Sequence, residues 1–337
     1  RKGSGFIMKK TLLALAVVTA AGSVSAAEIY KTDEGTVDFY GQLRTELKFL
    51  DDKDPTLGSG SSRAGVDAQY NVSDDLKVLG KVEFALKDSG DMYVRNHIAG
   101  LSSDSVGTIK LGKQWTLSDD VYGADYSYFF GGSALLYSTL NSALHDSQVK
   151  YSYDADNFWV KLGYGFDEDS SNQELVEVYA GTSFGDFSVH VGGGQVNDDV
   201  VGSTHEGLEH TYYEGTVEYS KDALTLGATL AGSSIESAND KADQTGITLG
   251  AMYGIADKTT VYGGYEFVSQ DHSALEDSDV IYVGVEYKYA SWARVYAEYG
   301  YADGDTLGFN RQGTDAVVVP QGVDGASNFG IGARVYW

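Results

Sequence analysis

Histidines and carboxylates, the side chains that most often bind metals, gather between residues 197 and 210. His205 and His210 are five residues apart in a segment without a helical pattern, whereas a helical zinc pair needs a spacing of four. The sequence therefore indicates an exposed acidic loop and no metal site. The side chains concerned are Asp198, Asp199, His205, Glu206, Glu209 and His210.

Enzymatic catalysis is also disfavoured. A hydrolase needs a nucleophile or an activated water, with a histidine and a carboxylate within reach. The six histidines are scattered over positions 97, 145, 190, 205, 210 and 272. We therefore predict no catalytic residue and no cofactor.

The net charge of the chain limits the kinds of partner that it can bind. It carries 24 basic and 49 acidic residues, for a net charge of −25. Four of the basic residues and none of the acids precede residue 27, so the net charge from residue 27 onward is −29. Such a chain repels nucleic acid and attracts cations, although most of the acids are expected in solvated loops.

The first 26 residues have the parts of an export signal. Met8-Lys9-Lys10 precedes an apolar stretch, and Val24-Ser25-Ala26 fits a small-residue cleavage site. A membrane anchor is the rival interpretation, but the apolar stretch is too short to span. We expect upstream residues at 1–7, a signal peptide at 8–26 and a single domain at 27–337.

The elements that position the remaining side chains are strands, and the last one shows the pattern best. Apolar residues alternate with Gly330, Gly332, Arg334 and Tyr336 up to the terminal Trp337. A strand with lipid on one face and water on the other needs this alternation. The apolar row comprises Phe329, Ile331, Ala333, Val335 and Trp337.

The same alternation recurs in about sixteen segments, joined by turns that are short and long in succession. An open sheet in lipid would leave unpaired backbone groups at its edges, so the sheet must close. The sequence predicts an all-β fold, a transmembrane antiparallel up-and-down barrel of about 16 strands. The segments are 35–49, 59–72, 76–88, 92–102, 106–115, 146–155, 157–166, 174–184, 187–196, 209–219, 223–235, 245–254, 259–269, 279–289, 293–302 and 327–337.

The connection over 115–145 is far longer than a hairpin needs, and it is rich in Tyr, Phe, Gly and Ser. Burying its rings against the barrel wall would contribute roughly 1.5–3 kcal/mol each. We expect this third loop to fold into the lumen, with an exposed lid as the rival arrangement. The connection over 303–326 carries Arg311, Val317-Val318-Val319 and Pro320, and we hypothesise that it adds a second narrowing.

Short motifs along residues 27–337 resemble those of Gram-negative general diffusion porins. They are Ala27-Glu28-Ile29-Tyr30, Val37-Asp38-Phe39-Tyr40-Gly41, Ala99-Gly100-Leu101 with Val106-Gly107, Phe129-Phe130-Gly131-Gly132, and the aromatic terminal strand. The resemblance implies a homotrimer of sixteen-stranded barrels in the cell outer membrane. It also implies a pore constriction in which basic wall residues face acids of the third loop.

Arg63 and Arg95 match the wall arginines that the resemblance implies, and Arg44 and Lys81 face inward by alternation. A field between such residues and the loop acids would sort permeants by charge, although pairing for stability alone is the simpler interpretation. The chain departs from the family pattern at Gln42, at Phe129 and at Leu144-His145. The predicted constriction set is Arg44, Arg63, Lys81, Arg95, Asp119, Asp120, Asp125 and Arg311.

Three further partners follow from the same interpretation. Asn96 beside Ile98 on an outer face, with Lys113 nearby, predicts a subunit contact. Phe329, Ile331, Val335 and Trp337 predict an insertion signal, read as an added strand by the barrel assembly machinery. Outer-membrane lipid and lipopolysaccharide are expected around the barrel, with weak divalent-ion bridging through carboxylates such as Asp167, Glu168 and Asp169.

The function predicted from the sequence is a passive channel for small hydrophilic solutes and ions, with a mild preference for cations. A substrate-specific channel is the alternative. It should line its lumen with a continuous aromatic row, which the scattered Tyr40, Tyr93 and Tyr262 do not provide. A plugged barrel acting as an adhesin or receptor is a third interpretation.

Overall fold

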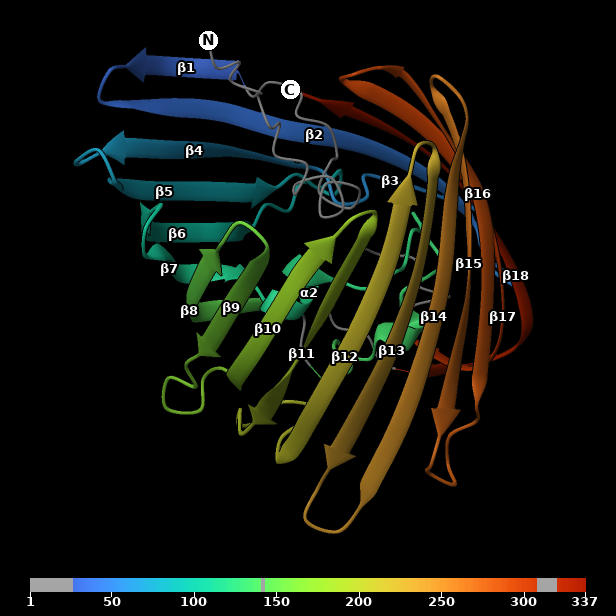
Figure 1. Ribbon diagram of the computed structural model, residues 1–337. Coiled ribbons are helices and arrows are strands. Elements are labelled where there is room, and N and C mark those ends of the chain that lie inside the picture. Colours follow the sequence, from blue (N-terminus) through green and yellow to red (C-terminus); the bar gives the residue numbers. More distant parts are fainter. Residues whose placement is uncertain (1–26, 141–142, 308–319) are drawn as a thin grey trace.

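The computed structural model describes residues 27–140, 143–307 and 320–337. The expected signal peptide and upstream residues lie outside these ranges. One antiparallel sheet closes on itself into a barrel, as the sequence predicts (Figure 1). Sixteen strands, β2 and β4–β18, form the wall of the barrel and are called its staves here. The short strands β1 and β3 extend the sheet along β2. No helix among the described residues is long and apolar enough to cross a membrane.

The strands are joined by short turns at one rim and by longer connections at the other. The strands from β11 to β18 are longer than those from β4 to β9, so the wall has a tall and a low side (Figure 1). Two short helices, α2 (Leu117–Val121) and η1 (Ser133–Leu135), lie between β7 and β8. The strands are β1 Ala27–Thr32, β2 Gly35–Phe49, β3 Thr56–Gly58, β4 Arg63–Asn71, β5 Leu76–Ala85, β6 Val94–Ser103, β7 Gly107–Trp115, β8 Leu144–Asp154, β9 Phe158–Gly165, β10 Glu174–Phe184, β11 Phe187–Asp198, β12 Leu208–Lys221, β13 Leu224–Glu236, β14 Lys241–Ala256, β15 Thr259–Gln270, β16 Ser278–Ala290, β17 Ala293–Leu307 and β18 Pro320–Tyr336.

The barrel closes where β18 pairs with β2, from Phe329 opposite Phe49 to Tyr336 opposite Gln42. The start of β2 pairs with β1 instead, with Ala27 opposite Phe39. Both partners run antiparallel to β2, so β1 continues the line of β18 towards the short-turn rim. One stave of the barrel is thus built from the two ends of the described chain.

The predicted alternation of side chains is confirmed. In β18, Phe329, Ile331 and Val335 are exposed on the outside of the barrel, whereas Asn328 and Tyr336 are buried. Buried glutamates, glutamines and threonines face inward on many other strands. This distribution inverts that of a soluble protein, as expected of a barrel with lipid outside and a polar interior.

The connection predicted over 303–326 is shorter than expected. β17 continues to Leu307 and β18 begins at Pro320, so both strands extend beyond the predicted ends as a paired hairpin. A bulge between Ala302 and Gly304 interrupts the alternation, which is why the pattern alone ended the strand too early. Arg311 and Val317-Val318-Val319 lie outside the described residues.

Candidate functional site

The third loop, described here over residues 116–140 and at residue 143, folds into the lumen as predicted. It leaves β7, crosses the interior and returns to β8, and α2 lies inside the ring of strands (Figure 1). Its contacts are concentrated on the wall formed by β10–β17, here called the far wall. The remaining staves, β18, β2 and β4–β9, form the near wall. The loop therefore narrows the lumen.

Backbone N–H groups of the loop are held by wall carboxylates, beginning with Glu177 on β10. The side chain of Glu177 is only 2 % exposed. It accepts hydrogen bonds from the N–H groups of Leu117 at 2.6 Å and Ser118 at 3.0 Å, and from the Tyr212 hydroxyl at 2.7 Å. The first N–H groups of a helix have no partner within the helix, so a carboxylate satisfies them and complements the helix dipole. Glu177 therefore fixes the start of α2 to the far wall.

Glu266 and Glu298 hold the loop in the same way further along. Glu266 on β15 accepts from the N–H groups of Gly132 at 2.6 Å and Ser133 at 2.9 Å, at the start of η1. Glu298 on β17 accepts from three successive N–H groups, at 2.5, 3.1 and 2.8 Å, and from the Tyr262 hydroxyl at 2.9 Å. Those three N–H groups belong to Tyr128, Phe129 and Phe130.

The three glutamates, Glu177, Glu266 and Glu298, are called the latch carboxylates here. The sequence analysis did not identify them, although their place in the inward rows of their strands was a usable signal. An acid buried in such a row needs several donors to offset its lost hydration. The backbone N–H groups of an inserted loop can supply several such donors at once.

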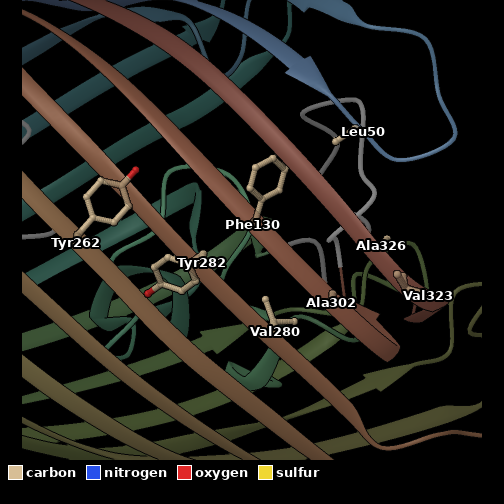
Figure 2. Close-up of a cluster of buried hydrophobic side chains, with 8 residues drawn as sticks. All are labelled: Leu50, Phe130, Tyr262, Val280, Tyr282, Ala302, Val323 and Ala326. Carbon is tan, nitrogen blue, oxygen red and sulfur yellow. The ribbon is translucent and has the colours of Figure 1, made fainter.

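Apolar contacts reinforce the latch. Phe130 is 3 % exposed and packs in a cluster with Tyr262 on β15 and Tyr282 on β16 (Figure 2). The hydroxyl of Tyr282 accepts the N–H of Tyr126 at 2.9 Å. The tip of the loop is therefore both packed against the far wall and hydrogen-bonded to it.

A row of arginines crosses adjacent strands, from β2 and β18 of the near wall to β17 of the far wall. Arg44 on β2 lies opposite Arg334 on β18, and Arg334 lies opposite Arg294 on β17. With its amide oriented to accept, Gln42 Oε1 lies 3.0 Å from Arg44 Nη2 and 2.7 Å from Arg63 Nε. Gln42 thus links two of the predicted constriction arginines. Like charges directly opposite one another repel, so this row needs carboxylates and rings around it.

Those neighbours are present. The Arg334 guanidinium lies 4.5 Å from the ring centre of Tyr128 and 5.0 Å from that of Tyr296, and the two rings stack at 3.9 Å. Arg294 pairs with Glu286 at 2.9 Å. Arg334 and Arg294 were absent from the predicted set, although the inward position of Arg334 was already apparent from the alternation. The third loop contributes Tyr128 directly to this row.

Arg95 enters the lumen through a β-bulge. Glu83 on β5 pairs with Asn96, and the next pair is Phe84 with Val94, so Arg95 is the extra residue. Its Nε lies 2.7 Å from Glu83 Oε1, and its guanidinium lies 4.7 Å from the Trp115 ring centre.

The bulge overturns part of the predicted subunit contact. Asn96 donates to Glu83 Oε1 at 3.3 Å, and Ile98 lies opposite Lys81, so both belong to the inner face. The alternation counted from Arg95 placed them outside, because one extra residue reverses every later position. His97 occupies the outer face instead, opposite Lys113 of β7, which forms an ion pair with Asp146.

The predicted loop acids take different roles. Asp120 pairs with Lys150 of β8, whose Nζ also donates to the Trp115 carbonyl at 2.7 Å. Asp119 accepts from the Tyr137 hydroxyl at 3.1 Å. Withdrawal from water, together with the neighbouring Asp120, raises the pKa of the Asp119 carboxyl to about 6.

Asp125 is 5 % exposed and accepts hydrogen bonds from the Tyr122 hydroxyl at 2.9 Å and the Ser127 N–H at 3.0 Å. It therefore stabilises the turn of the loop rather than facing the arginines. Lys81, the remaining predicted basic residue, pairs with Asp67 at 3.2 Å and lies 4.7 Å from the Tyr40 ring centre.

Within the described ranges, no group of three or more histidine or acidic side chains is arranged to hold a metal ion. His205 and His210, the two histidines that the sequence analysis considered as metal ligands, lie in different environments. His210 is fully buried and bonded to Ser233 at 2.9 Å, whereas His205 lies in the loop after β11.

A closed barrel with an apolar outer face, narrowed by an inserted loop that faces a row of arginines, defines a pore-forming protein of the outer membrane. The sequence profile of the Gram-negative porin family matches residues 12–307. The chain belongs to this family, whose members are channels and not enzymes.

Relatives agree over nearly the whole chain. "Porin-like protein H" of Photobacterium profundum is 30 % identical, over 90 % of this chain and 97 % of its own length. The structure of in-vitro folded OmpT of Vibrio cholerae is 56 % identical, with a TM-score of 0.84 over 92 % of this chain and 100 % of that one. A trimer form of OmpT is 58 % identical, with a TM-score of 0.84 over 90 % of this chain and 100 % of that one.

Proposed function

We propose that this porin is a general diffusion channel for small hydrophilic solutes and ions, with a mild preference for cations. The observation that carries the proposal is the latched third loop, which crosses the lumen and meets charged groups of the near wall, such as Lys150. Among the described residues, the inward rings of Tyr40, Trp115 and Tyr296 form no continuous aromatic row, because arginines and carboxylates separate them. This favours a general channel over a substrate-specific one.

The proposed preference for cations follows from the way charged side chains pair inside the barrel. Three near-wall cations have carboxylate partners: Arg95 pairs with Glu83, Lys81 with Asp67 and Lys150 with Asp120. The chain from residue 27 onward has an excess of 29 negative charges, many of them in the connections at the rims. A balanced neck between acidic mouths should enrich cations modestly.

Replacing Arg63 and Arg95 together by Ala tests this assignment. Conductance and cation preference should both rise, because positive charge and bulk leave the neck and Glu83 loses its partner. The measurement is the reversal potential of single channels in a planar bilayer under a salt gradient. The shift should fade at high salt, where the Debye length is about 3 Å at 1 M against about 10 Å at 0.1 M.

The matched control is Arg63→Lys with Arg95→Lys, which keeps both charges and should keep the parental ion preference. An unchanged reversal potential of the double Ala variant in dilute salt would remove these two arginines from the permeation path.

We also propose a homotrimer, as in the trimer form of OmpT. On the low side of the wall, the outer faces of β6–β8 present His97 and the Lys113–Asp146 pair. Polar side chains there are better covered by another subunit than by lipid. Ala99 shares this outer face, two residues from His97.

Ala99→Trp should dissociate the trimer, because a bulky ring cannot fit between packed subunits. Ala228→Trp on the outer face of β13, which we expect to contact lipid, should leave it intact. Migration on unboiled gels and native mass in mild detergent measure the outcome. A monomeric parent, or equal behaviour of the two variants, would contradict the assigned contact.

The remaining expected partners are part of the same proposal. Removal of residues 8–26 on export, insertion by the barrel assembly machinery through Phe329, Ile331, Val335 and Trp337, and contact with lipopolysaccharide all fit an outer-membrane barrel. Of these, the terminal strand has the clearest structural support, because its apolar row lies on the lipid face.

A further inference from the structure

The indole of Trp337 packs over Gly41 on the outer face of β2, in a site called the Gly41 seat here. Gly41 and Trp337 exchange both backbone hydrogen bonds, at 3.0 and 3.1 Å. A Cβ atom on Gly41 would lie 2.2 Å from Cζ2 and 2.6 Å from Cε2 of the indole. The Phe39 ring centre lies 5.9 Å from the indole. The indole therefore occupies the space that any side chain at position 41 would need.

The seat also depends on register. The outward row of β2 contains two glycines, Gly35 at its start and Gly41, and the outward positions that flank Gly41 are Phe39 and Leu43. A slip of two residues between β2 and β18 would bring one of these large side chains beneath the indole. A slip of one residue would turn the whole outward row of β18 into the lumen. Only the observed pairing leaves room for Trp337.

We propose that the packing of Trp337 over Gly41 fixes the register of the β2–β18 seam, the seam that joins the first and last staves. This contact is called the register lock here. The occupant is the chain's own terminal indole. Closure by β2 also uses the backbone edge of β18 that an assembly partner would pair with, so docking of Trp337 excludes that partner. This second consequence rests on the proposed insertion signal, whereas the lock itself does not.

The test is a double-mutant cycle on protein refolded from denaturant into detergent, a setting without assembly machinery. The related OmpT is described as folded in vitro. The variants are Gly41→Ala, Trp337→Ala and both together. The control is Gly215→Ala on the outward row of β12, where a new Cβ would meet only Val191 Cγ1 at 3.6 Å.

Gly41→Ala should unfold roughly tenfold faster than the parent, as overpacking of a filled site does. Gly215→Ala should stay within about twofold, because ordinary van der Waals contact imposes no strain. In the Trp337→Ala background the effect of Gly41→Ala should shrink to what remains from the Arg63 carbonyl oxygen, 2.8 Å from the new Cβ. Heat-modifiable gel mobility followed over time gives each rate.

Equal effects of Gly41→Ala in both backgrounds would overturn the lock. Should Gly41→Ala fail to refold, recovery of folded barrel in the double variant supports the lock. Absence of that recovery, while Trp337→Ala folds alone, overturns it. Failure of Trp337 as an insertion signal would leave these refolding results unchanged and would appear only in cells, so the two ideas fail separately.

Discussion

Deleting Trp337 should remove most of the folded protein from the outer membrane while leaving export intact. The terminal strand carries its apolar row as far as Trp337, and the edge that it exposes before β2 closes the barrel is suited to recognition as an added strand. The deletion removes the last aromatic of that row together with the indole that occupies the Gly41 seat. Heat-modifiable protein in outer-membrane fractions measures the outcome.

Two controls make the result specific. Trp337→Phe keeps an aromatic ring on the lipid face and should retain most of the assembly. The exported but unassembled chain should accumulate outside the inner membrane in the deletion variant, which separates assembly from secretion. Parental amounts of heat-modifiable protein after the deletion would refute the role of the terminal residue.

Glu298→Ala should release the tip of the third loop and produce the largest change in conductance of any single lumen substitution. Three backbone N–H groups and the Tyr262 hydroxyl lose their acceptor at once. A buried donor left without a partner costs roughly 1–3 kcal/mol, so the inserted position becomes unfavourable. Single-channel recordings should show a larger and noisier current, and thermal unfolding should begin earlier.

The matched control is Glu214→Ala, which also removes one inward carboxylate from the far wall. Glu214 is bonded to His190 and Thr216 rather than to the loop backbone. It should therefore change ion preference slightly without adding noise. Should both variants give the same current trace, the latch carboxylates would not be what positions the loop.

Most of the fold could be predicted from the alternation of apolar and polar residues in the strands, for a physical reason. Every stave must present apolar side chains to lipid at alternate positions, so the signal is repeated along the whole barrel. The inserted loop was equally predictable, because its length and its rings have no other use at a barrel mouth. Sequence reasoning thus reaches the architecture and the inward position of Arg44, Arg63 and Lys81.

The finer parts of the site depend on irregularities that alternation does not record. One extra residue at Arg95 moved Asn96 and Ile98 to the inner face, and a bulge beyond Ala302 hid the extension of β17. The latch carboxylates were missed for a different reason. Their partners are backbone N–H groups of a distant loop, and no side-chain motif in the sequence signals such a contact.

The composite stave has a consequence for the chain as a whole. Trp337 pairs with Gly41 and Ala27 with Phe39, so only the position opposite Tyr40 separates these two residues along β2. A single inserted residue could bridge them, and a new start could be cut in the four-residue connection over 237–240. Such a circular permutation would move the chain ends to another connection of the barrel without altering any strand pair.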